Sequence, residues 1–196
     1  MKKLSIACVL LSFVVGCIPS LHEIYTKDTL IYDANLVGTW KGDPNSEDAW
    51  IFEKADPNSG SYKVTFIENG KPGKFDAHLC KIGSVRYLDL YPQDPNLPYN
   101  DFYKMHLLPV HTFMKVESIS PTLSLRMMKP DELAQKLKAE PNLVKHEKGK
   151  DSILLTASPK ELQKFLIAVA NEPNLYDDIS ELKQFTDPNT TLRTKN

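Results

Sequence analysis

The chain has 196 residues, of which 41% are hydrophobic and 25% are charged; both shares lie near the averages of globular domains and exclude a disordered protein. The length suffices for one substantial hydrophobic core. The formal net charge is only -1, which argues against nucleic acid as a partner, because nucleic-acid binding normally needs a basic face.

The first seventeen residues are typical of an export and lipidation signal. Two lysines supply a basic start, and an almost uninterrupted apolar run follows from Leu4 to Val15. This run is shorter than the roughly 20 residues of a transmembrane helix. It ends in Val14-Val15-Gly16-Cys17, which resembles the lipobox of bacterial lipoproteins. In that family the cysteine receives diacylglycerol and becomes the mature N-terminus, so the resemblance predicts a signal peptide over residues 1–16 and lipidation of Cys17.

A lipidated Cys17 implies a protein of the cell envelope, with the membrane as a partner through the N-terminal lipid. The next residue is Ile18, not the Asp that in enteric bacteria tends to retain lipoproteins at the inner membrane. The resemblance therefore implies the outer membrane, facing the periplasm, if the organism has two membranes. We expect residues 17–34 to form a lipidated tether, residues 35–186 a single domain and residues 187–196 a flexible tail.

Cysteine usage leaves no disulfide to support the fold. Cleavage of the signal peptide removes Cys8, and it removes Lys2 and Lys3, which changes the formal net charge from -1 to -3. With Cys17 acylated, only Cys80 remains, so no intramolecular disulfide can form. We interpret Cys80 as a small buried apolar residue.

The folded part is predicted to consist mostly of short strands. Apolar and polar residues alternate with the period of two that half-buried strands show. Asn69-Gly70 predicts a type I′ hairpin turn, because both residues accept positive φ angles. Three prolines predict an irregular loop from Pro92 to about Asn100. The predicted strands are Leu36–Trp40, Ala49–Glu53, Tyr62–Phe66, Lys74–Ile82, Val85–Tyr91, Phe102–Leu108, His111–Ser118, Thr122–Met128 and Ser152–Ala157.

Two helices are predicted in the last third of the chain, over residues 130–139 and 158–171. The second begins with Ser158 as its N-cap, a proline as its first helical residue and Glu161 closing a capping box. Both helices place leucines on one face, as amphipathic helices do. Residues 175–185 are expected to form a further short helix.

The triplet Gly38-Thr39-Trp40 resembles the G-x-W element of the lipocalins and the wider calycin group. In that family the tryptophan closes one end of an eight-stranded antiparallel barrel. The chain also resembles uncharacterised bacterial lipoproteins of lipocalin-like type, in Leu88-Asp89-Leu90 and in Thr156-Ala157-Ser158 through Glu161-Leu162-Gln163. The resemblance implies a mainly β fold: a lipocalin-like antiparallel β-barrel of about eight strands, with one helix before the last strand and one or two C-terminal helices.

Aromatic residues on the predicted strands are expected to line the interior of this barrel. A small barrel is filled by such side chains, whereas a wider one holds one small ligand, and the sequence leaves both open. The candidates for a ligand pocket are Trp40, Trp50, Phe52, Phe66, Phe75, Tyr87 and Phe113. The leading hypothesis is a lipid-anchored protein that binds a small apolar ligand. The alternative is a non-enzymatic interaction or scaffold module whose loops, especially Pro92–Asn100, dock another envelope protein.

No pattern typical of an enzyme, a cofactor site or a metal site can be identified. The five histidines include His78, His106 and His111, but no pair has the spacing of two ligands on one helix, and Cys-x-x-Cys partners are missing. We interpret them as partly buried and hydrogen-bonded. No Gly-x-Ser-x-Gly elbow is present, and no serine or cysteine has a recognisable catalytic setting. A third hypothesis is a hydrolase whose site the sequence does not reveal, and a serine or cysteine within hydrogen-bond reach of one of these histidines would support it.

Overall fold

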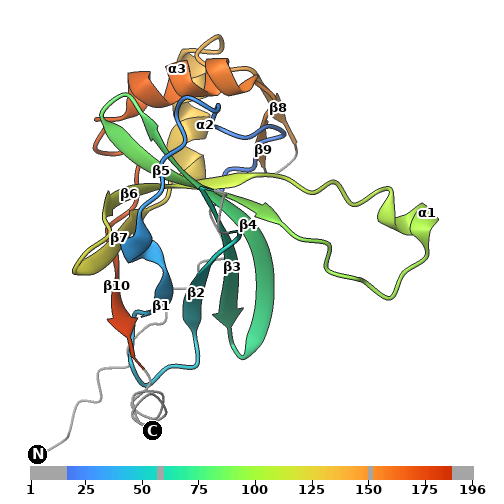
Figure 1. Cartoon of the computed structure of the whole chain (residues 1–196). Coiled ribbons are helices and arrows are strands. Elements are labelled where there is room, and N and C mark those ends of the chain that lie inside the picture. Colours follow the sequence, from blue (N-terminus) through green and yellow to red (C-terminus); the bar gives the residue numbers. More distant parts are fainter. Residues whose placement is uncertain (1–16, 57–59, 150–151, 187–196) are drawn as a thin grey trace, which may run out of the picture.

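Eight antiparallel strands close into a barrel in the computed structural model, which describes residues 17–56, 60–149 and 152–186 (Figure 1). Around the barrel the strand order is β1-β10-β7-β6-β5-β4-β3-β2. The predicted mainly β architecture is thereby confirmed, and the barrel is compatible with a lipocalin-like fold. The predicted signal peptide (1–16) and the predicted tail (187–196) lie outside the described residues.

Most barrel strands follow one another as a meander. The hairpin between β3 and β4 turns at Asn69 and Gly70, whose φ angles are 51° and 72°, as the Asn-Gly pair predicts. Every neighbouring pair is antiparallel. The barrel strands are β1 (Gly38–Lys41), β2 (Ala49–Lys54), β3 (Ser61–Glu68), β4 (Lys71–Ile82), β5 (Val85–Pro92), β6 (Thr112–Ser118), β7 (Thr122–Arg126) and β10 (Ser180–Phe185).

The strand that closes the barrel is β10, and the expectation of a helix over residues 175–185 is wrong. β10 pairs with β1 on one side and with β7 on the other. Its sequence is largely polar and only Leu182 packs against the barrel interior, so it carries little strand signal of its own. The open edges of β1 and β7 supply hydrogen-bond partners for the backbone of β10. This tertiary pairing outweighs the local sequence pattern.

The predicted strand over Ser152–Ala157 exists but lies outside the barrel. It is the short β9 (Ile153–Leu155), which pairs with β8 (His146–Lys148) in a separate two-stranded sheet. The predicted helices are α2 (Pro130–Ala139) and α3 (Pro159–Val169), and both precede β10 in the chain. The Glu161 side chain accepts a hydrogen bond from the Ser158 backbone at 2.9 Å, as expected of the capping box.

A protruding segment replaces the strand expected over Phe102–Leu108. Residues 93–111, called the arm here, leave the barrel after β5 and return at β6, with the short helix α1 (Asp101–Lys104) near the far end (Figure 1). The Asn100 side chain caps α1 by accepting a hydrogen bond from the Tyr103 backbone at 2.9 Å. The apolar residues that suggested a strand are therefore not paired with the barrel.

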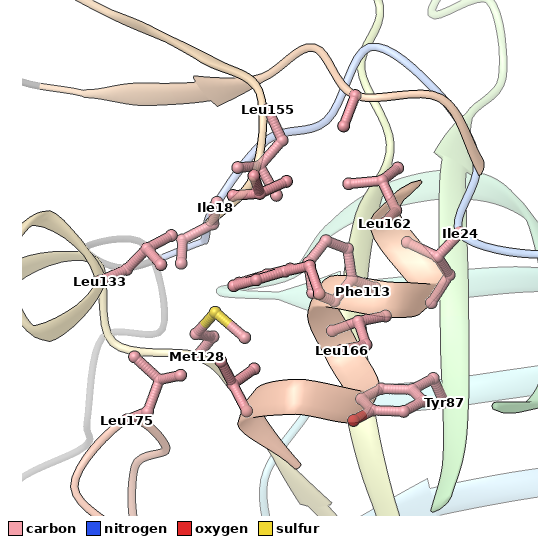
Figure 2. Close-up of a cluster of buried hydrophobic side chains, with 14 of the residues drawn as sticks. Ile18, Ile24, Tyr87, Phe113, Met128, Leu133, Leu155, Leu162, Leu166 and Leu175 are labelled. Carbon is pink, nitrogen blue, oxygen red and sulfur yellow. The ribbon is translucent and has the colours of Figure 1, made fainter. Parts of the chain in front are cut away.

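The protein has two hydrophobic cores, one on each side of the barrel wall. The inner core fills the barrel with side chains from β1 to β7. The outer core lies between the outer face of β4–β6 and a layer formed by α2, α3, β9 and the N-terminal segment. Figure 2 shows this outer core, in which Tyr87 and Phe113 of the barrel wall meet Leu162 and Leu166 of α3.

The N-terminal segment, expected as a tether over residues 17–34, packs against the fold from Ile18 onward. Ile18 and Ile24 are 5% and 0% exposed and belong to the outer core. Its backbone is paired as well: Ser20 forms bridges with His111 and with Leu155. The buried isoleucines complete a core that α2 and α3 alone leave open, which is why this segment does not behave as a free linker.

Candidate functional site

Packed side chains fill the barrel interior, which the sequence left open as a site for a small ligand. Trp40 and Phe52 are each only 1% exposed and lie in the inner core. The Trp40 indole donates a hydrogen bond to the Leu36 carbonyl at 2.8 Å, which fixes its ring inside the barrel. These two predicted pocket residues are thus in the interior, but they fill it.

Three further pocket candidates lie together at the border of the inner core. Trp50, Phe66 and Phe75 are partly buried. The rings of Trp50 and Phe66 stack with centroids 4.3 Å apart, because the two residues are register partners on β2 and β3. Phe75 packs against the same core from β4.

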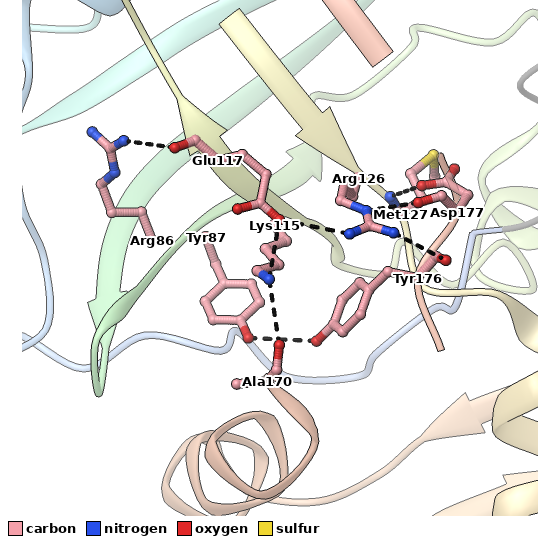
Figure 3. Close-up of polar contacts among 9 residues, drawn as sticks. All are labelled: Arg86, Tyr87, Lys115, Glu117, Arg126, Met127, Ala170, Tyr176 and Asp177. Atoms are coloured by element: carbon pink, nitrogen blue, oxygen red, sulfur yellow. Dashed lines mark hydrogen bonds and ion pairs between the residues drawn. The ribbon is translucent and has the colours of Figure 1, made fainter. Parts of the chain in front are cut away.

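The last two candidates, Tyr87 and Phe113, do not line the interior. Both belong to the outer core, on the opposite face of β5 and β6. The Tyr87 hydroxyl lies 3.5 Å from that of Tyr176 (Figure 3), and burial raises the pKa of Tyr87. Cys80 pairs with Tyr87 across the strands and is fully buried, as expected. Burial raises the pKa of its thiol to about 12, so Cys80 is unsuited to act as a nucleophile.

The polar contacts drawn in Figure 3 fasten the segment after α3 to the barrel wall. The Arg126 side chain donates to the Asp177 carbonyl at 2.6 Å, and the Asp177 carboxylate accepts from the Met127 backbone at 2.7 Å. The Lys115 ammonium pairs with Glu117 at 3.0 Å. These groups bond to one another and to backbone carbonyls, so we assign them a structural role.

The histidines singled out from the sequence have structural partners. The ring Nδ1 of His111 lies 2.7 Å from the buried carboxylate of Asp89. That of His106 lies 2.8 Å from the Phe102 carbonyl, and the His78 ring stacks on Tyr25. None of these partners is a serine or a cysteine, so these contacts give the hydrolase hypothesis no support. Within the described ranges, no group of three or more His, Cys, Asp or Glu side chains is placed to hold a metal ion.

The arm carries the most conspicuous surface of the molecule. Of the nine exposed large apolar side chains among the described residues, six lie on the arm. Phe102, Met105 and Leu108 are 74%, 80% and 65% exposed. The six residues are Tyr99, Phe102, Tyr103, Met105, Leu107 and Leu108. Six exposed large apolar side chains within ten positions indicate an interaction site, because isolated exposed apolar residues are the ordinary case.

The arm also forms one wall of a groove of about 920 Å³. The other wall includes the part of β4 that extends beyond its pairing with β5. The two strands part just after the Gln93 backbone donates a hydrogen bond to the Lys74 carbonyl at 2.9 Å. The lining includes the apolar residues Phe75, Leu97 and Leu107 and the cations Lys74 and Lys104.

Sequence reasoning placed the docking loop at Pro92–Asn100 and missed the residues beyond it. Prolines at positions 92, 95, 98 and 109 bracket the apolar stretch, and they are the signal that it cannot pair as a regular strand. Sequence reasoning also did not identify Asp89 as a buried carboxylate that binds other segments. The signal that could have identified it is a single carboxylate between Leu88 and Leu90 on a predicted strand.

Comparisons with protein-family models, with curated proteins and with solved structures found no match. Among the described helices, none combines the length and the apolarity that crossing a membrane requires.

Proposed function

We propose that this chain is a lipid-anchored protein of the cell envelope that acts as a non-enzymatic interaction module through its arm. The observation that carries the proposal is the exposed apolar surface of residues 99–108 on a rigid scaffold. Helix capping by Asn100 and ring contacts between Tyr99 and Tyr103, at 4.8 Å, hold this surface in shape. A preformed apolar surface lowers the entropy cost of binding.

The lipid anchor rests on the lipobox resemblance and on the position of Cys17. Its side chain is exposed, although the following residue, Ile18, is buried. A thioether-linked diacylglycerol can therefore leave the surface at this point without disturbing the outer core. The resemblance of the Gly38-Thr39-Trp40 triplet favours a lipocalin-like barrel, and the residue after Cys17 favours the outer membrane, facing the periplasm.

The lipid anchor is tested by metabolic labelling with an alkyne fatty acid, followed by cell fractionation. We expect label on the wild-type chain and recovery with the membranes, and neither for Cys17→Ala. An unlabelled wild-type chain would overturn the anchor.

The arm is tested by placing a photo-crosslinking amino acid at position 102 in cells. Position 167 on α3 is the control, because Ile167 is also exposed, at 56%, but lies away from the arm. We expect crosslinks to a distinct envelope component from position 102 only. Equal crosslinking from both positions would refute the interaction module.

The groove supports a second candidate function, the binding of a small apolar ligand. Its volume lies within the range of about 300–1,000 Å³ that small-molecule sites occupy. Apolar walls with Lys74 and Lys104 nearby suit an anionic amphiphile such as a fatty acid. Native mass spectrometry of the protein purified from its own envelope tests this: an added mass that Leu107→Glu removes supports the ligand, and a bare mass in every preparation refutes it.

A further inference from the structure

The N-terminal segment is clamped to the base of the arm. The Ser20 backbone donates to the His111 carbonyl at 2.9 Å, and the His111 backbone donates back to the Ser20 carbonyl at 2.8 Å. On its other side the segment bonds to Leu155, which donates to the Pro19 carbonyl at 2.9 Å. The chain around Ser20 is therefore fixed between two elements.

This clamp places the candidate lipidation site close to the base of the apolar arm. Cys17 precedes Ser20 by three residues, and Leu108 precedes His111 by three residues. Three residues of extended chain span at most about 11 Å. Because the bridge is antiparallel, Cys17 and Leu108 lie on opposite sides of it, each within about one such span of the same pair of backbone hydrogen bonds.

A lipid on Cys17 would leave the body of the protein almost no freedom to move away from the membrane. The core begins at Ile18, so no flexible residues separate the anchor from the fold. The base of the arm then lies within about 11 Å of the lipid attachment point.

We propose that the surface bound by the arm is the lipid bilayer that holds the protein's own N-terminal lipid. This rests on the proposed lipidation of Cys17 and names the partner of the same interaction surface. The arm enters the interfacial region as a second anchor, and two attachment points fix the orientation of the barrel on the membrane.

The chemistry of the arm suits the membrane interface. Three of its exposed residues, Tyr99, Phe102 and Tyr103, are aromatic, a class enriched where lipid headgroups meet the hydrocarbon region. Its aliphatic residues add apolar area that water otherwise covers. The Lys104 ammonium lies 3.8 Å from the Asp101 carboxylate, so these opposite charges at α1 are close to each other. Lys104 can also reach anionic headgroups.

The experiment places a tryptophan on the arm of the lipidated protein. Phe102→Trp is reconstituted into phosphatidylethanolamine–phosphatidylglycerol vesicles that contain spin-labelled lipid. Its fluorescence is compared with that of the wild type, whose own tryptophans lie inside the inner core (Trp40) and at its border (Trp50). The matched control is Ile167→Trp on α3. Ile167 lies beside Gly83, at the opposite end of β5 from the arm.

We expect the spin label to quench the tryptophan at position 102 several-fold more than the one at position 167, with a blue-shifted emission. Equal quenching at both positions, in protein that floats with the vesicles, would overturn the bilayer contact while leaving the anchor intact. In the crosslinking experiment, crosslinks from position 102 to a protein and to no lipid would do the same. A chain that carries no acyl group and does not float would overturn the anchor and the arm insertion together.

Discussion

The ring Nδ1 of His111 lies 2.7 Å from the carboxylate of Asp89, a side chain with no exposed surface. The other carboxylate oxygen accepts a hydrogen bond from the Ile24 backbone at 3.1 Å. One buried carboxylate on β5 thus joins the base of the arm to the N-terminal segment. The tilted contact between Tyr91 and the His111 ring, at 4.5 Å, covers this pair from the same strand.

Loss of the Asp89 carboxylate is expected to destabilise the fold. Asp89→Ala leaves the Ile24 N–H and the His111 ring without their buried partner, at a cost of about 2–4 kcal/mol in the free energy of unfolding. Urea denaturation measures this change. The control is Asp76→Ala, which breaks the exposed pair of Asp76 with Lys63 and should cost less than about 1 kcal/mol. Equal losses in both variants would contradict the structural role of Asp89.

Stability is expected to fall at mildly acidic pH because of His78. Burial, as the largest cause, lowers the pKa of His78 below its ordinary value of 6.5, although Asp89 and Asp76 oppose this. Below about pH 6.5 the unfolded chain then binds a proton that the folded chain does not, so the free energy of unfolding falls as the pH drops towards the folded pKa.

The measurement is the urea midpoint at about pH 7.5 and about pH 5.5 for the wild type and for His78→Gln. We expect a smaller acid-induced loss in the variant, whose amide does not titrate. An identical loss in both proteins would exclude His78 as the source.

Cys80 is expected to resist thiol reagents in the folded protein. Its thiol is buried, and the pKa of about 12 leaves almost no thiolate at neutral pH. In a chain that begins at position 17 and carries Cys17→Ser, we expect no reaction with a maleimide until urea unfolds the protein. Ser84→Cys, at the exposed turn between β4 and β5, is the control and should react at once. Rapid labelling of Cys80 without denaturant would show that the outer core opens.

The two tryptophans are expected to contribute unequally to stability. Trp40→Ala removes a fully buried ring and its hydrogen bond, at a cost of about 3–5 kcal/mol. Trp50→Ala removes a partly exposed ring from the border of the same core and should cost about 1–2 kcal/mol. Urea unfolding followed by far-ultraviolet circular dichroism compares them without relying on tryptophan emission. A larger loss for Trp50→Ala would contradict the filled interior around Trp40.

The alternation of apolar and polar residues predicted most of the strands, because successive side chains of a strand point to its two opposite faces. It could not say which face looks inward at Tyr87 and Phe113. Both faces of β4–β6 are covered, one by the inner core and one by the outer core, so apolar residues occur on either side. A second core of this kind removes the polar face on which the assignment depends.

The elements that the sequence did not predict depend on distant partners. β10 is a strand only because β1 and β7 offer it two edges. The N-terminal segment is ordered only because His111 and Leu155 bond to Ser20 and its neighbours. Neither relationship leaves a local pattern, whereas the capping box of α3 lies within four residues and was readable.

The pairing of Ser20 with His111 and Leu155 also has a consequence for biogenesis. The residues next to Cys17 cannot reach their final positions until the chain has emerged as far as Leu155, about 135 positions later. If the chain is exported and lipidated as proposed, the cysteine and its neighbours are accessible before folding draws Ile18 into the core. For a lipidated chain, this order makes Cys17 available for acylation before the barrel closes.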